Sequence, residues 1–201
     1  MTNILVLVAA YLIGAIPFGY LLVRMKSGED VRALGSGNIG ATNVLRTTGR
    51  SLGFATLLLD IGKGVLAVWM ADRLLGGSAF WMSLTALAVM AGHAFPIFLK
   101  FKGGKAVASF VGAFLYLTPV PLLTVLLVFV ITVAATRYIS LGSVLAAGFF
   151  PASVFLIDHP PNIVVLAATV AGAFIVIRHT SNLKRIRDGN ENVFSLGGRK
   201  R

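Results

Sequence analysis

Long apolar runs separated by short basic segments constrain this chain more than any other feature of its sequence. Hydrophobic residues make up 57% of the 201 residues, charged residues only 12%, and the mean hydropathy is +0.87. A soluble domain typically carries about twice that share of charged residues. Lipid must therefore solvate most of the surface, and the sequence predicts an integral membrane protein.

Seven apolar segments are candidates for membrane-spanning helices, judged against the roughly 20 residues that cross a bilayer. Pro119 and Pro121 divide the longest run, because proline costs a helix interior ~3 kcal/mol. The piece before them is short for a span, so five spans are the alternative if short pieces are re-entrant. We expect a single domain over residues 1–201, an all-α polytopic bundle of about seven transmembrane helices. The candidates are Ile4–Val23, Ser51–Leu75, Ser78–Leu99, Ala106–Leu117, Pro121–Thr136, Ile139–Ile157 and Asn162–Ile177.

The positive charges predict the orientation. With seven helices, the loops on one side and the C-terminal tail hold 16 of the 18 Lys and Arg residues. The other side holds little beyond Arg73. Positive residues are retained in the cytoplasm, so we expect the N-terminus outside and the C-terminus inside.

Composition excludes several classes of function. The net charge of +11 could suggest nucleic acid, but the basic clusters lack an interleaved aromatic face for stacking on bases. There is no Cys, so no thiolate is available as a nucleophile or zinc ligand. The three His residues lack the spacing of metal ligands. We expect no nucleic-acid partner, no metal and no cofactor.

The first unusual cytoplasmic stretch is Gly35–Arg46, which contains a G-x-G-x-x-G match. A transmembrane segment precedes it instead of the strand that a dinucleotide fingerprint needs, so the match is discounted. Small residues still let backbone N–H groups approach an anion, and the second half could open a helix. A flexible linker is the alternative. The side chains that could bind a substrate are Ser36, Asn38, Thr42, Asn43 and Arg46.

The second stretch, residues 100–109, places three lysines around Gly103 and Gly104. It is not a P-loop, because Leu99 and Ala106 occupy positions that a P-loop gives to Gly and Ser or Thr. Simple positive-inside anchoring would explain the charge. A glycine pair before a helix favours a phosphate cradle with Lys105.

The third stretch, residues 179–194, is a polybasic segment after the last apolar run, as in many proteins that contact anionic lipid. Lipid contact does not explain His179 and Asn182, which would share one face if the helix continues. His179 could act as a base near neutral pH or simply form a hydrogen bond.

Two charges fall inside an apolar run, where charges are expensive and are usually paired or functional. Asp60 and Lys63 are spaced for a mutual ion pair, and Lys63 could alternatively bind substrate. His93, in the cytoplasmic third of its helix, is interpreted as a buried structural histidine.

Taken together, these segments resemble the bacterial acyl-phosphate:glycerol-3-phosphate acyltransferases of the PlsY type. The resemblance covers nearly the whole chain. It includes Gly-Ala-Ile-Pro-Phe-Gly at the end of the first apolar run, Leu-Leu-Leu-Asp-Ile-Gly-Lys-Gly around Asp60, and Gly-His-Ala-Phe-Pro-Ile-Phe-Leu-Lys-Phe-Lys-Gly-Gly-Lys. Each motif is weak alone, but their order on one side of the membrane is specific.

The resemblance implies a seven-helix enzyme of the bacterial cytoplasmic membrane with its site at the cytoplasmic face. It would transfer a fatty acyl group from acyl phosphate to the 1-hydroxyl of glycerol 3-phosphate, giving lysophosphatidic acid and phosphate early in phospholipid synthesis. Membrane lipid and neighbouring lipid-synthesis enzymes are the other expected partners. The donor is already activated, so positioning and oxyanion stabilisation could supply most of the acceleration.

Residue by residue, the resemblance links Ser36, Arg46, His179 and Asn182 to catalysis. It links the Gly103–Lys105 segment to glycerol 3-phosphate and gives Glu191 a structural role. Weaker candidates for the acyl-phosphate end are Thr42, Asn43 and Ser143.

The acceptor of the hydroxyl proton is left open between His179 and a substrate phosphate oxygen, of which the phosphate is favoured because the site is basic. A His-x-x-x-x-Asp acyltransferase is not supported, since no Asp stands five residues after any His. A small transporter of an organic phosphate is the alternative function, but transporters usually show internal repeats, and none is evident. Acyl-chain preference and oligomeric state are not readable from this sequence.

Overall fold

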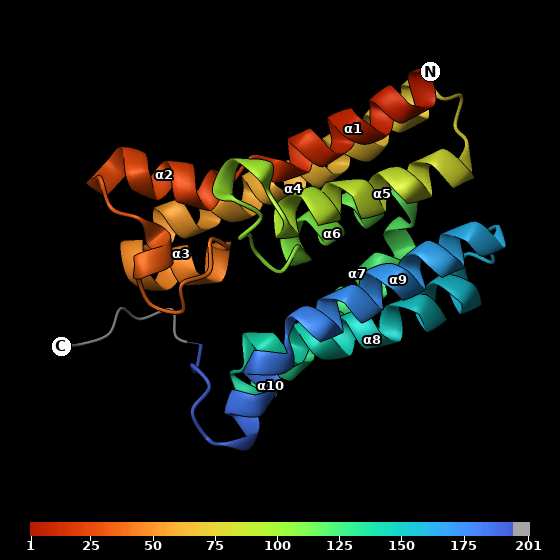
Figure 1. The fold of residues 1–201 in the computed structure, drawn as a ribbon. Coiled ribbons are helices and arrows are strands. Elements are labelled where there is room, and N and C mark those ends of the chain that lie inside the picture. The colour runs from red at the N-terminus through yellow and green to blue at the C-terminus, as the bar shows by residue number, and fades with distance from the viewer. Residues whose placement is uncertain (195–201) are drawn as a thin grey trace. The chain divides into compact units, whose positions relative to one another are not determined.

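The computed structural model describes residues 1–194, which form helices joined by short loops, with no strand in that range (Figure 1). The expectation of an all-α membrane protein is confirmed. The chain falls into two compact units, Met1–Tyr116 and a second that begins at Leu117. The first contains α1 Thr2–Ala15, α2 Phe18–Ser27, the 3-10 turn η1 Val31–Ala33, α3 Ala41–Thr48, α4 Arg50–Leu74, α5 Ala79–Ala94, the 3-10 turn η2 Ile97–Leu99 and nearly all of α6 Val107–Leu117.

The first apolar run is broken between α1 and α2, at Ile16 and Pro17. Ile16 adopts an extended conformation, with φ −62° and ψ 113°, because the ring of a following proline disfavours the helical region. The sequence predicts one span from Ile4 to Val23, mildly interrupted at Gly14 and Pro17. The interruption is a full break between two helices of the apolar segment Thr2–Ser27, and it releases the Ile16 carbonyl from the helical hydrogen-bond pattern.

Within the first unit, α1, α4 and α5 pack side by side, while α2 and α3 both contact α4 (Figure 1). Glycine lets α4 and α6 approach closely. A Cβ on Gly64 would collide with the Ser109 carbonyl and lie 2.7 Å from the Ala113 nitrogen. Contacts between small residues are a usual means of packing helices in membranes.

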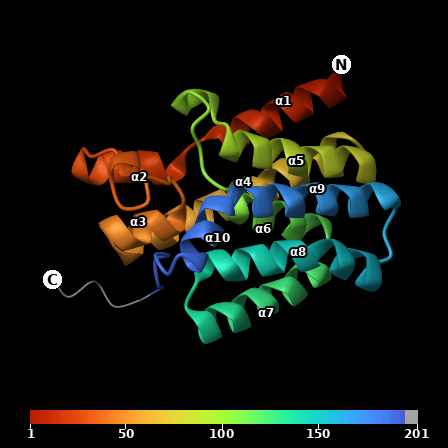
Figure 2. The same ribbon diagram turned by 60° about the horizontal axis from the view of Figure 1, so that its bottom comes forward.

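In the second unit, α8 Ile139–Ile157 packs against both α7 Pro119–Thr136 and α9 Asn162–Arg178. The short helix α10 Thr180–Arg187 follows α9 after a bend of 49° (Figure 2). The bend shows that the last helix does not continue straight through residue 179.

Five helical segments are long and apolar enough to cross a membrane: Thr2–Ser27, Arg50–Leu74, Ala79–Leu99, Pro119–Thr136 and Ile139–Ile157. The bent pair α9 and α10 would make a sixth. Large apolar side chains such as Leu127, Val130 and Ile131 are exposed on α7, as a lipid-facing surface requires.

All seven apolar segments of the sequence are helical. Helix α7 begins at Pro119 and not, as predicted, at Pro121. Proline lacks an N–H donor, but the first turn of a helix does not use its donors, so both prolines fit there. Helix α6 has only 11 residues, about half the length that spans a bilayer.

The close approach of α4 to α6 predicts that Gly64→Ala destabilises the protein, because an added methyl group has no space against the α6 backbone. We expect a cost of about 1–3 kcal/mol, seen as a lower melting temperature in detergent. Gly62→Ala on the same helix is the matched control, since no atom lies within 4 Å of its Cβ position. Equal melting temperatures for the two variants would contradict this packing.

Candidate functional site

The buried amide of Asn43 organises the first glycine-rich stretch. Its Nδ2 donates to the carbonyl oxygens of Asn38 at 2.9 Å, Leu34 at 3.0 Å and Val31 at 3.3 Å. Its Oδ1 accepts the Ser36 N–H at 2.9 Å, and the residue is only 2% exposed. Both ends of the amide are therefore engaged within the loop, so Asn43 acts as a scaffold in this structure.

Position 35 of the same loop requires a glycine for two reasons. Its φ is +55°, a left-handed conformation that favours glycine. A Cβ on Gly35 would also lie 2.5 Å from the Asn43 Oδ1 and 2.8 Å from the Thr47 Cγ2. The glycine-rich pattern therefore reflects how tightly the loop wraps around Asn43.

The other candidate side chains of this stretch lie around the loop and on α3. Ser36 is exposed, and the Asn38 Oδ1 accepts the Gly40 N–H at 2.8 Å just before α3. Thr42 is half-buried in the first turn of α3, and Arg46 is exposed in its last turn. The predicted helix after the glycines is thus confirmed. The loop presents the Ser36 hydroxyl, and the helix presents the Arg46 guanidinium, at the surface of one unit.

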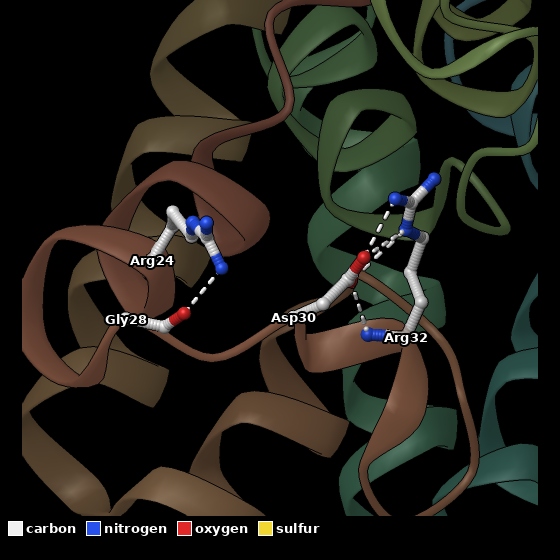
Figure 3. A network of polar contacts seen from close by, with 4 residues as sticks. All are labelled: Arg24, Gly28, Asp30 and Arg32. Carbon is white, nitrogen blue, oxygen red and sulfur yellow. Dashed lines mark hydrogen bonds and ion pairs between the residues drawn. The ribbon is translucent and has the colours of Figure 1, made fainter.

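A pair of opposite charges precedes this loop (Figure 3). Arg32 binds Asp30 through Nε and Nη2, the shortest contact being 2.6 Å, and the Arg24 guanidinium donates to the Gly28 carbonyl. The hydrogen bonds from the Arg32 side chain hold the pKa of Asp30 below its ordinary value, although burial opposes them. Much of the Arg32 charge is therefore neutralised locally.

A cluster of apolar side chains connects the first stretch with η2, which directly precedes the second stretch. Its members come from α2, η1, the loop before α3, α3 itself and η2, all within the first unit. The buried residues are Val23, Val31, Ile39, Val44 and Leu99, with Tyr20 and Leu52 packed against them.

The predicted ion pair between Asp60 and Lys63 is present, with Lys63 Nζ 2.7 Å from Asp60 Oδ1 and both side chains 3% exposed. Lys63 also donates to the Ile16 carbonyl at 3.0 Å, the group released by the break before Pro17. The Nδ1 of His93 lies 3.6 Å from the same Oδ1 of Asp60. The contacts assign Lys63 to the interior of the unit, where it pairs with protein groups.

The second stretch is bonded to the end of α5. The N–H of Gly103 donates to the Ala94 carbonyl at 3.2 Å, and that of Gly104 to the His93 carbonyl at 3.1 Å. Two of the N–H groups expected to cradle a phosphate are therefore used within the protein. Lys105, which follows directly, is half-buried.

Glu191 is the centre of the third stretch. Its Oε1 accepts from Asn182 Nδ2 at 2.7 Å and from the Ser140 hydroxyl at 3.0 Å, while its Oε2 pairs with Arg185 Nε at 2.7 Å. The sequence indicated a structural role for Glu191 but not its partners. Ser140 was missed, and its only signal was a polar residue at the start of an apolar run.

The His179 Nδ1 lies 2.7 Å from the Ile175 carbonyl oxygen. A carbonyl can only accept, so Nδ1 carries the hydrogen and the neutral ring would accept a proton at Nε2. His179 and Asn182 are 3% and 6% exposed. In α8, Ser143 is buried and its hydroxyl donates to the Ile139 carbonyl at 2.9 Å. Among residues 1–194, no group of three or more His, Asp or Glu side chains could hold a metal ion.

These features define an integral membrane protein whose polar groups are gathered in a few structured segments between apolar helices. The family model described as glycerol-3-phosphate acyltransferase matches residues 4–189. The glycerol-3-phosphate acyltransferase of Geobacter sulfurreducens is 48% identical over 96% of this chain and 99% of its own length. That of Desulforamulus reducens is 44% identical over 100% and 98%.

Solved structures agree with these sequence comparisons. The glycerol 3-phosphate form of PlsY, an integral membrane glycerol 3-phosphate acyltransferase, is 35% identical and superposes with a TM-score of 0.91 over 97% of this chain and 96% of its own. The lysophosphatidic acid form is 33% identical, with a TM-score of 0.88 over 98% and 97%. This chain belongs to the glycerol-3-phosphate acyltransferase family.

The Asn43 geometry predicts that both Asn43→Ala and Asn43→Asp loosen the first loop. Each removes the amide donor from three carbonyl oxygens, of which those of Val31 and Leu34 keep a backbone N–H donor. An unsatisfied buried group costs about 1–3 kcal/mol, and the aspartate adds a charge facing these oxygens. We expect lower melting temperatures and faster tryptic cleavage after Arg32 in both variants. Asn190→Ala, at an exposed position, serves as control. An aspartate variant as stable as wild type would show that the amide donors do not hold this loop.

The Glu191 contacts predict an acid-sensitive third stretch. Burial would raise the pKa of this carboxyl, but hydrogen bonds from Asn182, Arg185 and Ser140 lower it below the ordinary 4.5. The ionised Glu191 carboxylate therefore stabilises the folded protein fully above pH 4.5, and this stabilisation is lost as the pH falls through the folded-state pKa.

Glu191→Gln should accordingly lower the melting temperature at neutral pH, with the difference from wild type shrinking below pH 4.5. Glu29→Gln, at an exposed position, should show no such difference. Melting curves measured in detergent across this pH range check both variants. A constant difference at every pH would argue against ionisation as its cause.

Proposed function

We propose that this protein transfers a fatty acyl group from acyl phosphate to the 1-hydroxyl of glycerol 3-phosphate, giving lysophosphatidic acid and phosphate. The observation that carries the proposal is the match over nearly the full chain to the glycerol 3-phosphate and lysophosphatidic acid forms of a solved acyltransferase. The family model likewise spans both compact units, which supports a single functional domain.

The reaction needs no covalent enzyme intermediate. The hydroxyl oxygen attacks the acyl carbonyl, the tetrahedral oxyanion collapses, and the carbon–oxygen bond to phosphate breaks. The hydroxyl proton passes to a phosphate oxygen of a substrate, with His179 as the other candidate acceptor. Cationic and N–H donors that stabilise the oxyanion and hold both phosphates would supply most of the acceleration.

Ser36 and Arg46 are the proposed catalytic groups of the first stretch. Thr42 is a weaker candidate for the acyl-phosphate end, and Asn38 is a further substrate-binding side chain. Both catalytic side chains are exposed on a loop and helix whose backbone is held by Asn43. That arrangement suits groups that must keep their position before the substrates arrive.

Lys105 is proposed to bind the phosphate of glycerol 3-phosphate, with the glycine pair fixing its backbone. His179 and Asn182 are proposed as the catalytic pair of the third stretch. Ser143, in α8, is a weaker candidate for the acyl-phosphate end. Asn182 is held by Glu191 at 2.7 Å, which supports a fixed orientation for its amide.

The proposed location is the bacterial cytoplasmic membrane, with seven membrane-crossing segments, the N-terminus outside and the polar stretches facing the cytoplasm. The distribution of Lys and Arg supports this orientation. The seventh crossing depends on α6 together with the loop before it, because α6 alone is short. Acyl phosphate would enter from lipid, and neighbouring lipid-synthesis enzymes would supply it.

The test is phosphate release and lysophosphatidic acid formation by the purified protein given palmitoyl phosphate, with and without glycerol 3-phosphate. We expect release only when both substrates are present, and none with a palmitoyl thioester as donor. Ser36→Ala and Arg46→Ala should each lower kcat by about 10²–10³. Arg73→Ala removes the same charge from an exposed side chain (66% exposed) and should leave kcat unchanged. Transfer from the thioester alone would replace the proposed donor, and uptake without ester formation would indicate a transporter.

A further inference from the structure

His93 occupies the point where the buried charges of α4 meet the second glycine-rich stretch. It lies at the end of α5 and is 3% exposed. Its Nδ1 is 3.1 Å from the Ser109 hydroxyl in α6 and 3.6 Å from the Asp60 carboxylate in α4. The ring is thus bounded by polar groups on two neighbouring helices, which restricts its rotation.

The opposite edge of the ring faces Gly104. A Cβ on Gly104 would have three nearest neighbours, all of them ring atoms of His93: Nε2 in direct collision, Cδ2 at 2.9 Å and Cε1 at 3.4 Å. The φ of Gly104 is outside the left-handed range, so its backbone conformation is open to any residue. The contact with the ring is therefore what excludes a side chain at this position.

The backbone on either side of Lys105 is held firmly. Gly104 is bonded through its N–H to the His93 carbonyl at 3.1 Å. Ala106 is fully buried and has a φ of +61°, and Lys100 and Phe101 in the same loop have φ values of +53° and +62°. Conformations of this kind persist only when surrounding contacts impose them, and they often occur at functional sites.

We propose that His93 is a positioning residue for glycerol 3-phosphate binding: its ring, anchored by Ser109 and Asp60, sets the position of Gly104 and thereby of Lys105. This inference rests on the proposed function, since it names the group that places the phosphate-binding lysine. His93 itself touches neither substrate. Its effect on catalysis is exerted through the backbone of the loop.

The geometry predicts a specific compensation between two substitutions. Gly104→Ala should raise KM for glycerol 3-phosphate by about fivefold or more, because the methyl group displaces the loop from the ring. KM for palmitoyl phosphate should change little, and kcat less than KM. His93→Asn keeps a polar atom near Ser109 but removes the ring edge that faces Gly104. In the double variant, the added methyl group fits the vacated space. Gly104→Ala should therefore raise KM for glycerol 3-phosphate much less in the His93→Asn background than in the wild-type background.

The experiment measures KM and kcat for both substrates in wild type, the two single variants and the double variant, with melting temperatures alongside. If Gly104→Ala fails to fold, recovery of folded protein by the added His93→Asn supports the same contact, and no recovery overturns it. The proposal is also overturned if the fold-changes in KM of the two single variants simply multiply in the double variant. An equal rise in KM for both substrates would overturn it as well. Lys105→Ala serves as a reference for losing the phosphate contact. A wild-type protein without glycerol 3-phosphate-dependent turnover would refute the proposed function instead.

Discussion

The ammonium group of Lys63 holds together the part of the first unit on which the first two polar stretches depend. It bridges the Asp60 carboxylate and the Ile16 carbonyl, so it connects α4 to the break between α1 and α2. Asp60 in turn faces His93 on α5. Removing one member of such a buried pair typically costs about 3–5 kcal/mol, because the other charge is left unpaired. The pair therefore specifies one arrangement of these helices more than it adds net stability.

A similar arrangement occurs in the first and third polar stretches, where one buried side chain satisfies several polar groups. Asn43 binds three carbonyls and one N–H in the first stretch. Glu191 accepts from three side chains in the third. Buried polar groups are costly when unpaired, so these networks tolerate few alternative conformations. The loops are consequently ordered even though glycine and polar residues dominate their composition.

The sequence predicted the helices well because hydrophobic runs in a membrane protein report directly on lipid exposure. The seven apolar segments are all helical, with ends displaced by a few residues. Its errors fall at prolines. The sequence predicts only a mild interruption at Pro17, but α1 ends just before this proline, and Pro119 begins α7 instead of preceding it. The consequence of a proline depends on whether neighbouring groups bind the released carbonyl, as Lys63 does here, and this is a tertiary property.

The sequence likewise predicted some features of the candidate site but could not explain others. Residue types and spacing were enough to select Asp60 and Lys63 as a pair, whereas the structural role of Glu191 came only from the family resemblance. They were not enough to explain Gly103 and Gly104, whose N–H groups looked suited to an anion but bind the end of α5. Only a three-dimensional contact could show that a histidine eleven residues earlier in the sequence leaves no room for a side chain at Gly104.

A rigid loop has a physical advantage in the proposed reaction. Both substrates carry phosphate, so bringing them together costs electrostatic repulsion that fixed cations must offset. A lysine on a mobile loop would lose up to about 2 kcal/mol of side-chain entropy, in addition to the cost of ordering its backbone, each time it closed on a phosphate. Gly104 and Ala106 fix the backbone on both sides of Lys105. Most of the entropy lost in ordering this backbone is therefore lost when the protein folds and not when the substrate binds. More of the binding energy then remains to hold the hydroxyl of glycerol 3-phosphate against the acyl carbonyl, where it lowers the barrier to transfer.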